Sequence, residues 1–163
     1  VLESSSPVFV KIDGDRARND FGIDTPYDEV HWKPDHGTGV FFERIRENLQ
    51  RKYRLAYGEK PPEPPYFTNY SLERTVGKPV EFPEHDYQYV LSRWQLEFGL
   101  DSKSHRKLLD LALNAGIGSL NSMGFGLVNI EHGASLSSTT QHVRTRDSDT
   151  HTDPARTVTE VEQ

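Results

Sequence analysis

The sequence contains no cysteine and is poor in apolar residues. Only 34% of its 163 residues are hydrophobic, and no apolar run approaches the roughly 20 residues that a membrane-crossing helix needs. The absence of cysteine excludes disulfides and thiolate metal ligands and fits an intracellular, cytoplasmic protein. No signal peptide is visible, and we expect no membrane partner. The chain starts at Val1 rather than Met, directly before a strand-like segment, and we expect a trimmed or fragmentary N-terminus.

The net charge of -6 argues mildly against a nucleic-acid-binding protein, whose surface is usually basic. The charge is unevenly distributed, however: residues 133–163 carry -2, which leaves -4 for residues 1–132. One predicted helix carries +3 from five basic and two acidic residues, namely Arg44, Arg46, Arg51, Lys52, Arg54, Glu43 and Glu47. Binding to nucleic acid therefore remains open.

The apolar periodicity predicts six regular elements. Alternation predicts strands over 7–12, 66–76, 87–100 and 124–131, and a helical period predicts helices over 38–57 and from 103 to 115. Thr38 is expected to cap the first helix and Asp101-Ser102 the second, whereas Gly58 and Gly116 are expected to end the helices. Residues 13–36 are polar and rich in turn residues, and we expect a long loop there.

The order strand, helix, strand, strand, helix, strand predicts an α+β ferredoxin-like fold. In this fold a four-stranded antiparallel sheet carries both helices on one face. RNA-recognition domains share it with small-molecule and metal-binding domains, so the fold alone does not give a function. We expect one domain over 1–132. The remaining residues, 133–163, hold 11 Ser or Thr among 31 and no aromatics, which predicts a tail that is flexible or bound to a partner.

Four glycines mark the segment from Gly116 to Gly126, which reads Gly-x-Gly, five residues, then Gly-x-Gly. A soluble domain tolerates the entropy cost of glycine where its backbone turns tightly or lies against a ligand. Small polar side chains lie among the glycines at Ser119, Asn121 and Ser122. The segment is either a flexible turn or a loop whose N–H groups bind phosphate. It follows a helix and opens a strand, unlike the dinucleotide-binding fingerprint.

Other chemistry is poorly supported by the sequence. Seven histidines are present, but His31 and His36 lack a fourth ligand for a metal site, and His105 is expected to face solvent or RNA. No Ser-His-Asp spacing, Walker loop or zinc motif is found, so we predict no metal and no cofactor. The C-terminal end of the second helix points its negative dipole at the glycine segment. Cations on that helix could compensate for it: Lys103, Arg106 and Lys107.

The glycine segment, placed between the second helix and the last strand and ending in Asn-Ser-Met-Gly-Phe-Gly, resembles the C-terminal signature of CRISPR repeat-processing endoribonucleases of the RAMP superfamily. Ser6-Pro7-Val8 and the helix segment 47–53 support the resemblance, which covers about residues 4–131. The family has two ferredoxin-like halves and cleaves precursor CRISPR RNA without metal, through attack of the substrate 2'-hydroxyl on the adjacent phosphate. This chain is similar to the second half, so the acid-base residue is expected outside it.

The resemblance implies that RNA is bound by the loop and by nearby cations. The positions carried over are Gly116, Gly118, Ser119, Asn121, Ser122, Gly124, Gly126 and Lys52, to which we add Lys103, Arg106 and Lys107. Leu120 departs from the family, which often has Lys or Arg at this position. The implied partners are CRISPR repeat RNA and other subunits of an antiviral effector complex. Two alternatives remain: a non-catalytic RAMP subunit that scaffolds RNA and proteins, and a ferredoxin-like small-molecule sensor.

Overall fold

The computed structural model describes residues 1–81 and 86–131, with the backbone alone over 78–81 and 86–88. The elements in chain order are β1 (Leu2–Ser4), β2 (Lys11–Asp13), α1 (Gly14–Asn19), β3 (Glu29–His31), η1 (Pro34–His36), α2 (Thr38–Tyr57), β4 (Phe67–Glu81), β5 (Asp86–Phe98), α3 (Lys103–Ala115), η2 (Asn121–Met123) and β6 (Val128–Ile130). The predicted tail lies outside the described residues.

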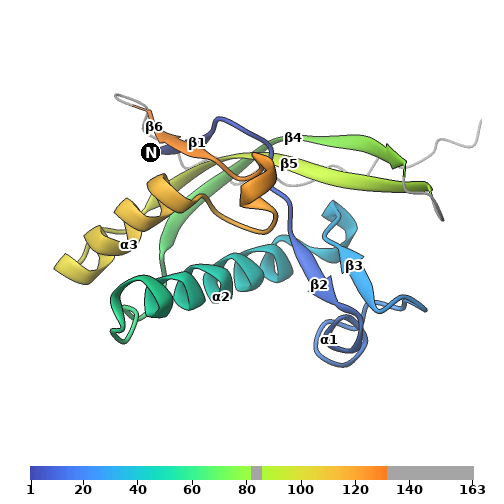
Figure 1. The fold of residues 1–163 in the computed structure, drawn as a ribbon, viewed down its shortest axis with the longest axis horizontal. Helices are drawn as coiled ribbons and strands as arrows, with labels where there is room; N and C mark the ends of the chain where they lie inside the picture. Colours follow the sequence, from blue (N-terminus) through green and yellow to red (C-terminus); the bar gives the residue numbers. More distant parts are fainter. Residues whose placement is uncertain (82–85, 132–163) are drawn as a thin grey trace, which may run out of the picture.

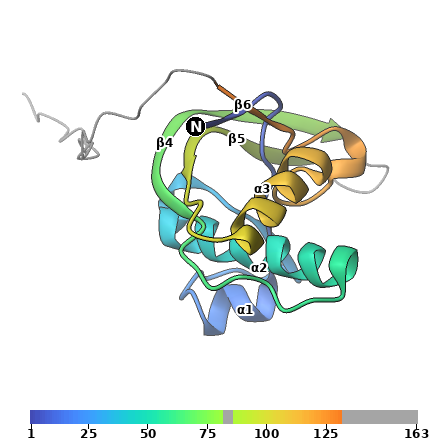
Figure 2. The same ribbon diagram turned by 90° about the vertical axis from the view of Figure 1, so that its left-hand side faces the viewer.

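The main sheet has four antiparallel strands in the order β4-β5-β1-β6. The first strand in the chain thus lies in the centre, between the last strand and the second strand of the long β4–β5 hairpin. Helices α2 and α3 both cover one face of this sheet (Figures 1 and 2). The α+β ferredoxin-like prediction is confirmed.

The start of the chain differs from the prediction. The first strand of the sheet is β1, whereas the predicted strand 7–12 joins the sheet only through an isolated bridge from Val8 to Ser92. Its second half, β2, pairs instead with β3 in a separate two-stranded sheet. The predicted loop 13–36 therefore contains α1, β3 and η1, which form a small unit inserted before α2 (Figure 1). Alternation correctly predicted that Val8, Val10 and Ile12 are buried, but it placed Phe9 on the opposite face, and Phe9 is buried as well. It gave no information on the pairing partner.

Helix α2 occupies the predicted residues 38–57 and buries Phe41, Ile45, Leu49 and Tyr53, one side chain per turn. It ends as predicted at Gly58, which adopts a left-handed conformation with φ 64°. The predicted N-cap at Thr38 is wrong: the cap position is Gly37, which has no side chain to accept a hydrogen bond.

Helix α3 begins as predicted, because the Ser102 hydroxyl accepts a hydrogen bond from the backbone N–H of His105. The final strand is shorter than predicted, with β6 limited to Val128–Ile130. No helix among the described residues is long and apolar enough to cross a membrane.

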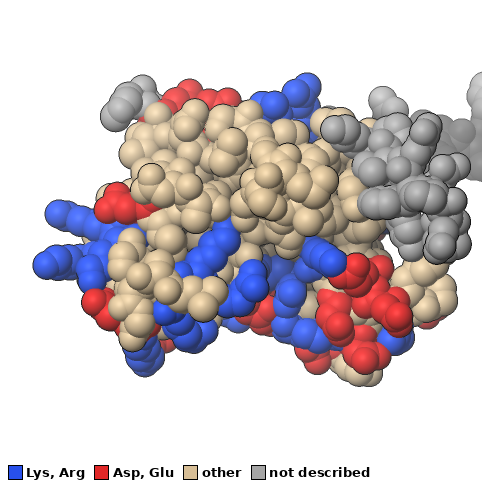
Figure 3. Space-filling model, viewed as in Figure 1, with Lys and Arg blue, Asp and Glu red and all other residues tan. Residues whose placement is uncertain are grey.

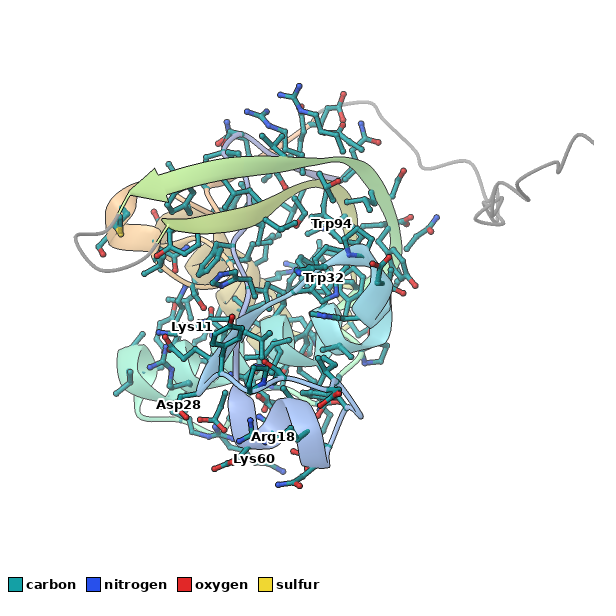
Figure 4. All side chains as sticks on the ribbon, turned by 90° about the vertical axis from the view of Figure 1, so that its right-hand side faces the viewer. Lys11, Arg18, Asp28, Trp32, Lys60 and Trp94 are labelled. Carbon is teal, nitrogen blue, oxygen red and sulfur yellow. The ribbon has the colours of Figure 1, made fainter. Side chains whose placement is uncertain are left out.

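Aromatic packing fixes the inserted unit on the core. The ring of Trp32, just after β3, lies 4.9 Å from Phe41 of α2 and 5.8 Å from Trp94 of β5, measured between ring centroids. Phe41 stacks on Trp94 at 4.4 Å. Figure 4 shows Trp32 and Trp94 between the small sheet and the β4–β5 hairpin. These buried rings hold β2 and β3 beside the N-terminal half of α2, and this placement shapes the site described next.

Candidate functional site

The segment 116–126 forms a loop that connects α3 to β6, and we call it the glycine loop. All four of its predicted glycines have positive φ angles, between 70° and 86°. A Cβ on Gly126 would lie 1.9 Å from the carbonyl oxygen of Ile117, and one on Gly118 would lie 2.6 Å from that of Phe9. These two glycines are therefore required because backbone packs directly on backbone. The loop is tightly folded rather than flexible.

Five of the loop's eleven backbone amides donate hydrogen bonds within the protein. Ile117 donates to Gly126 at 2.8 Å, while Ser119 donates to Phe9 and Gly126 donates to Pro7, also at 2.8 Å. The amides of Met123 and Gly124 close the η2 turn. The prediction that exposed amides bind phosphate is wrong for these five. The side-chain hydroxyls of Ser119 and Ser122, by contrast, make no hydrogen bond within the described part of the chain.

Lys52 organises the loop from α2. Its ammonium donates three hydrogen bonds, to the carbonyl oxygens of Ala115 at 3.1 Å and Gly116 at 2.7 Å, and to Oδ1 of Asn121 at 2.7 Å. Two of these acceptors are at the negative end of α3, so Lys52 supplies the charge compensation expected there. Burial, with a smaller contribution from the charge of Arg51, lowers the pKa of Lys52 to about 8.

Asn121 completes this bracing inside the loop. Its Nδ2 donates to the carbonyl oxygens of Ile117 at 3.0 Å and Phe125 at 2.8 Å, while its Oδ1 accepts from Lys52. Asn121 and Lys52 thus use their polar atoms to hold the loop in shape. Their roles as direct RNA contacts remain predictions, and the geometry assigns them a positioning role.

The three sequence motifs behind the resemblance meet at this loop. The Ser6 hydroxyl accepts a hydrogen bond from the amide of Leu127, and the Pro7 carbonyl accepts one from Gly126. Lys52 joins the helix motif to the same loop. Segments that are far apart in the sequence therefore form one structural unit.

The cations of α3 lie at the other end of that helix. Lys103 is twelve residues before Ala115, which at about 1.5 Å per residue separates it from the loop by about 18 Å. Lys107 binds both carboxylate oxygens of Glu59 at 2.9 Å. The expectation that Lys103, Arg106 and Lys107 compensate the dipole at the glycine loop is wrong, because Lys52 does so. Their contact with RNA stays a prediction.

The prediction that His105 faces solvent or RNA is also wrong. His105 is buried, with 7% of its surface exposed. Its Nδ1 lies 2.9 Å from the Ser102 hydroxyl and its Nε2 lies 3.0 Å from the carbonyl oxygen of Glu63. The ring thus ties the start of α3 to the turn after α2. In the described ranges, no group of three or more His, Asp or Glu side chains is placed to hold a metal ion.

A hollow of about 450 Å³ lies between the glycine loop, α2 and β2, and we call it the polar hollow. It is lined by Val10, Lys11, Asp13, Glu29, Arg44, Glu47, Asn48, Arg51, Gly118 and Ser119. Basic side chains gather along this side of α2 in Figure 3, with acidic ones beside α1 and β3. The hollow joins the predicted loop residues to four polar residues that were not predicted to bind RNA: Lys11, Arg44, Asn48 and Arg51.

The charges of the polar hollow are partly paired. Lys11 pairs with Glu29, and Glu47 accepts hydrogen bonds from Arg44 and from both terminal nitrogens of Arg16. Burial raises the pKa of Glu47, but the Arg16 hydrogen bond and the neighbouring arginine charges lower it more, so the carboxylate stays ionised at neutral pH. These pairs leave Arg51 as the exposed cation of the hollow, with no hydrogen bond or ion pair to another described residue.

Asn48 adds an unused acceptor to the hollow. Its Oδ1 is buried and has no hydrogen-bond partner among the described residues. An unpaired buried acceptor is costly unless a ligand or water satisfies it. Arg44, Asn48 and Arg51 repeat at the helical spacing of three or four residues, so a search for a polar stripe within α2 could have found them.

Comparison with known proteins identifies the family. The model of the family "CRISPR associated protein Cas6, C-terminal" matches residues 1–130. The chain belongs to this family. The CRISPR-associated endoribonuclease Cas6 of Haloferax mediterranei is 34% identical over 137 residues, which are 80% of this chain and 50% of that protein. The enzyme of the same name from Pyrococcus furiosus is 34% identical over 91 residues, which are 56% of this chain and 31% of that protein.

A solved structure of a CRISPR-associated Cas6 protein shares the fold. It has a TM-score of 0.51 at 22% identity, with 80% of this chain and 48% of that chain covered. The chain thus spans about half the length of the Haloferax relative and of this solved structure, and its match to the Pyrococcus relative covers about a third of that protein. The resemblance stated from the glycine signature is confirmed.

Proposed function

We propose that this chain is the RNA-binding C-terminal half of an endoribonuclease that processes precursor CRISPR RNA. The names of its Haloferax and Pyrococcus relatives support the activity. The observation that carries the proposal is the polar hollow, which is lined both by the exposed cation Arg51 and by Ser119 of the glycine loop. Cationic side chains and small hydroxyls are the groups that hold a phosphate backbone.

In this proposal the chain positions RNA, and its partner half supplies acid-base chemistry. The 2'-oxygen of the substrate attacks the adjacent phosphorus while the 5'-oxygen leaves, which gives a 2',3'-cyclic phosphate and a free 5'-hydroxyl. No metal takes part in these steps. The cations of the polar hollow hold a phosphate of the repeat, and the bound product stays in an effector complex.

Arg51→Ala in the full-length protein tests the RNA site. Arg51 makes no hydrogen bond to another described residue, so the fold is expected to be unaffected. Loss of one cation–phosphate contact weakens binding of labelled repeat RNA about 10-fold and lowers the slope of log affinity against log salt by about 0.7. Arg54→Ala is the matched control, because Arg54 is exposed on the same helix but does not line the hollow. Equal effects of the two variants would refute a specific phosphate site.

Cleavage assays with the same protein separate the proposed functions. Repeat RNA cut equally with and without chelator supports the metal-independent endoribonuclease. RNA that is bound but left intact favours the non-catalytic RAMP subunit. Failure to bind any RNA, together with thermal stabilisation by a metabolite, favours the small-molecule sensor.

A further inference from the structure

A second hollow, of about 480 Å³, lies on the other side of Lys11 and Glu29, which line both hollows. We call it the aromatic hollow, because its walls include Phe9, Tyr27, His31, Tyr89 and Leu120. Figure 4 shows two of its lining residues, Lys11 and Asp28, on one flank of the molecule near α1. Its volume falls within the roughly 300–1,000 Å³ that is typical of small-ligand sites.

The wall of this hollow is a cluster of rings. Phe9 is 1% exposed, and its ring lies 5.2 Å from His31 and 4.8 Å from Tyr89. His31 meets Tyr89 edge-on at 5.1 Å. Burial, followed by the charges of Lys33 and Lys11, lowers the pKa of His31, so its ring is uncharged at neutral pH. Tyr27 at the rim is 59% exposed, which leaves an aromatic face open to a ligand.

The glycine loop contributes to both hollows through consecutive residues. Ser119 lines the polar hollow, while Leu120 lines the aromatic one. Leu120 is the one residue other than glycine in the described chain with a positive φ, at 58°. A strained conformation of this kind persists where the surroundings impose it and often marks a functional position. An apolar side chain at this place favours a base over a phosphate.

We propose that the aromatic hollow binds one unpaired nucleobase of the RNA, next to a phosphate held in the polar hollow. The proposal rests on the proposed RNA-binding function. Proteins recognise unpaired bases by stacking them on aromatic rings. The carboxylates of Asp28 and Glu29 at the hollow repel phosphate but accept hydrogen bonds from amino groups. The site therefore prefers adenine, guanine or cytosine to uracil.

The experiment measures the affinity of the full-length protein for repeat RNAs that each lack one base. For wild type, one abasic position weakens binding about 10-fold. Tyr27→Ala weakens binding of intact RNA by the same factor, and its affinity no longer depends on whether that base is present. Tyr27→Phe keeps the aromatic ring and therefore behaves like the wild type in both measurements. Leu120→Gly, which removes the side chain and accommodates the φ angle, has the same effect as Tyr27→Ala.

Met123→Ala is the control, because Met123 is an exposed residue of the same loop that lines neither hollow. Unchanged thermal unfolding temperatures show that the variants are folded. If Arg51→Ala weakens binding but no abasic position becomes insensitive in Tyr27→Ala and Leu120→Gly, the nucleobase site is refuted and the RNA-binding function stands. If the wild type binds no repeat RNA, both fail.

Discussion

Replacing Lys52 by methionine tests whether this side chain holds the glycine loop in shape. Methionine keeps most of the side-chain length and removes the charge and all three hydrogen bonds, to Ala115, Gly116 and Asn121. Bonds from a charged donor each contribute roughly 1.5–3 kcal/mol, so three at the lower limit contribute about 4–5 kcal/mol. Burial of the ammonium, which lowers its pKa to about 8, offsets part of this. We expect a net loss of about 2–3 kcal/mol in the free energy of unfolding.

Urea unfolding measures that loss, and amide hydrogen exchange locates it. The amides of Ile117 and Gly126 donate within the loop and are expected to lose protection first. Arg51→Met is the matched control: the neighbouring residue is exposed, and its loss should change stability by less than about 0.5 kcal/mol. A loss below about 0.5 kcal/mol for Lys52→Met, or equal losses for both variants, would contradict the positioning role of Lys52.

Two further predictions follow from the loop geometry and from the Lys52 pKa. Gly126→Ala forces a Cβ into the Ile117 carbonyl, so we expect a loss of more than about 3 kcal/mol in the free energy of unfolding, measured with urea. The Cβ of Gly124→Ala meets no atom within 4 Å, so this variant should lose only the roughly 1–2 kcal/mol that a left-handed backbone costs. Equal losses for the two variants would be inconsistent with this geometry. By side-chain NMR, Lys52 should titrate near pH 8. The pKa of Lys52 is higher in the unfolded chain, so between pH 8 and about 10 the unfolded state binds more protons than the folded state. The free energy of unfolding should therefore rise over this pH range, and this rise should be absent in Lys52→Met.

The sequence predicted the parts of the fold that follow from local periodicity. Helix α2 matched its predicted bounds because its buried residues recur once per turn and glycine ends it. Strand β1 was missed because three residues are too short to show alternation. The predicted strand 7–12 holds the buried Val8 and Ile12, but Val8 bridges to β5 whereas Ile12 pairs with β3. That change depends on tertiary packing, which no local pattern reports.

The position of the glycine loop between α3 and β6 was predicted from the sequence, but its hydrogen bonding was not. Glycine spacing located the loop, yet the use of its amides depends on Phe9 and Pro7, more than 100 residues away. Lys52 was predicted to bind RNA through its charge. In the structure its ammonium donates to backbone oxygens of the loop, because α2 and α3 pack side by side. The residues of the polar hollow on β2 were missed for the same reason, since the inserted unit brings Lys11 next to the loop.

The bracing of the glycine loop bears on both proposed sites, because the loop lines both hollows. Its backbone bonds fix the loop on Phe9, and Lys52 fixes it on α2. With the backbone held, the left-handed turn at Leu120 places this residue and Ser119 on different hollows. In our proposal, one short segment thus separates the phosphate site from the nucleobase site. The spacing between the two sites is then set by a single turn, so substitutions that loosen the loop should weaken RNA binding even where they remove no contact to RNA.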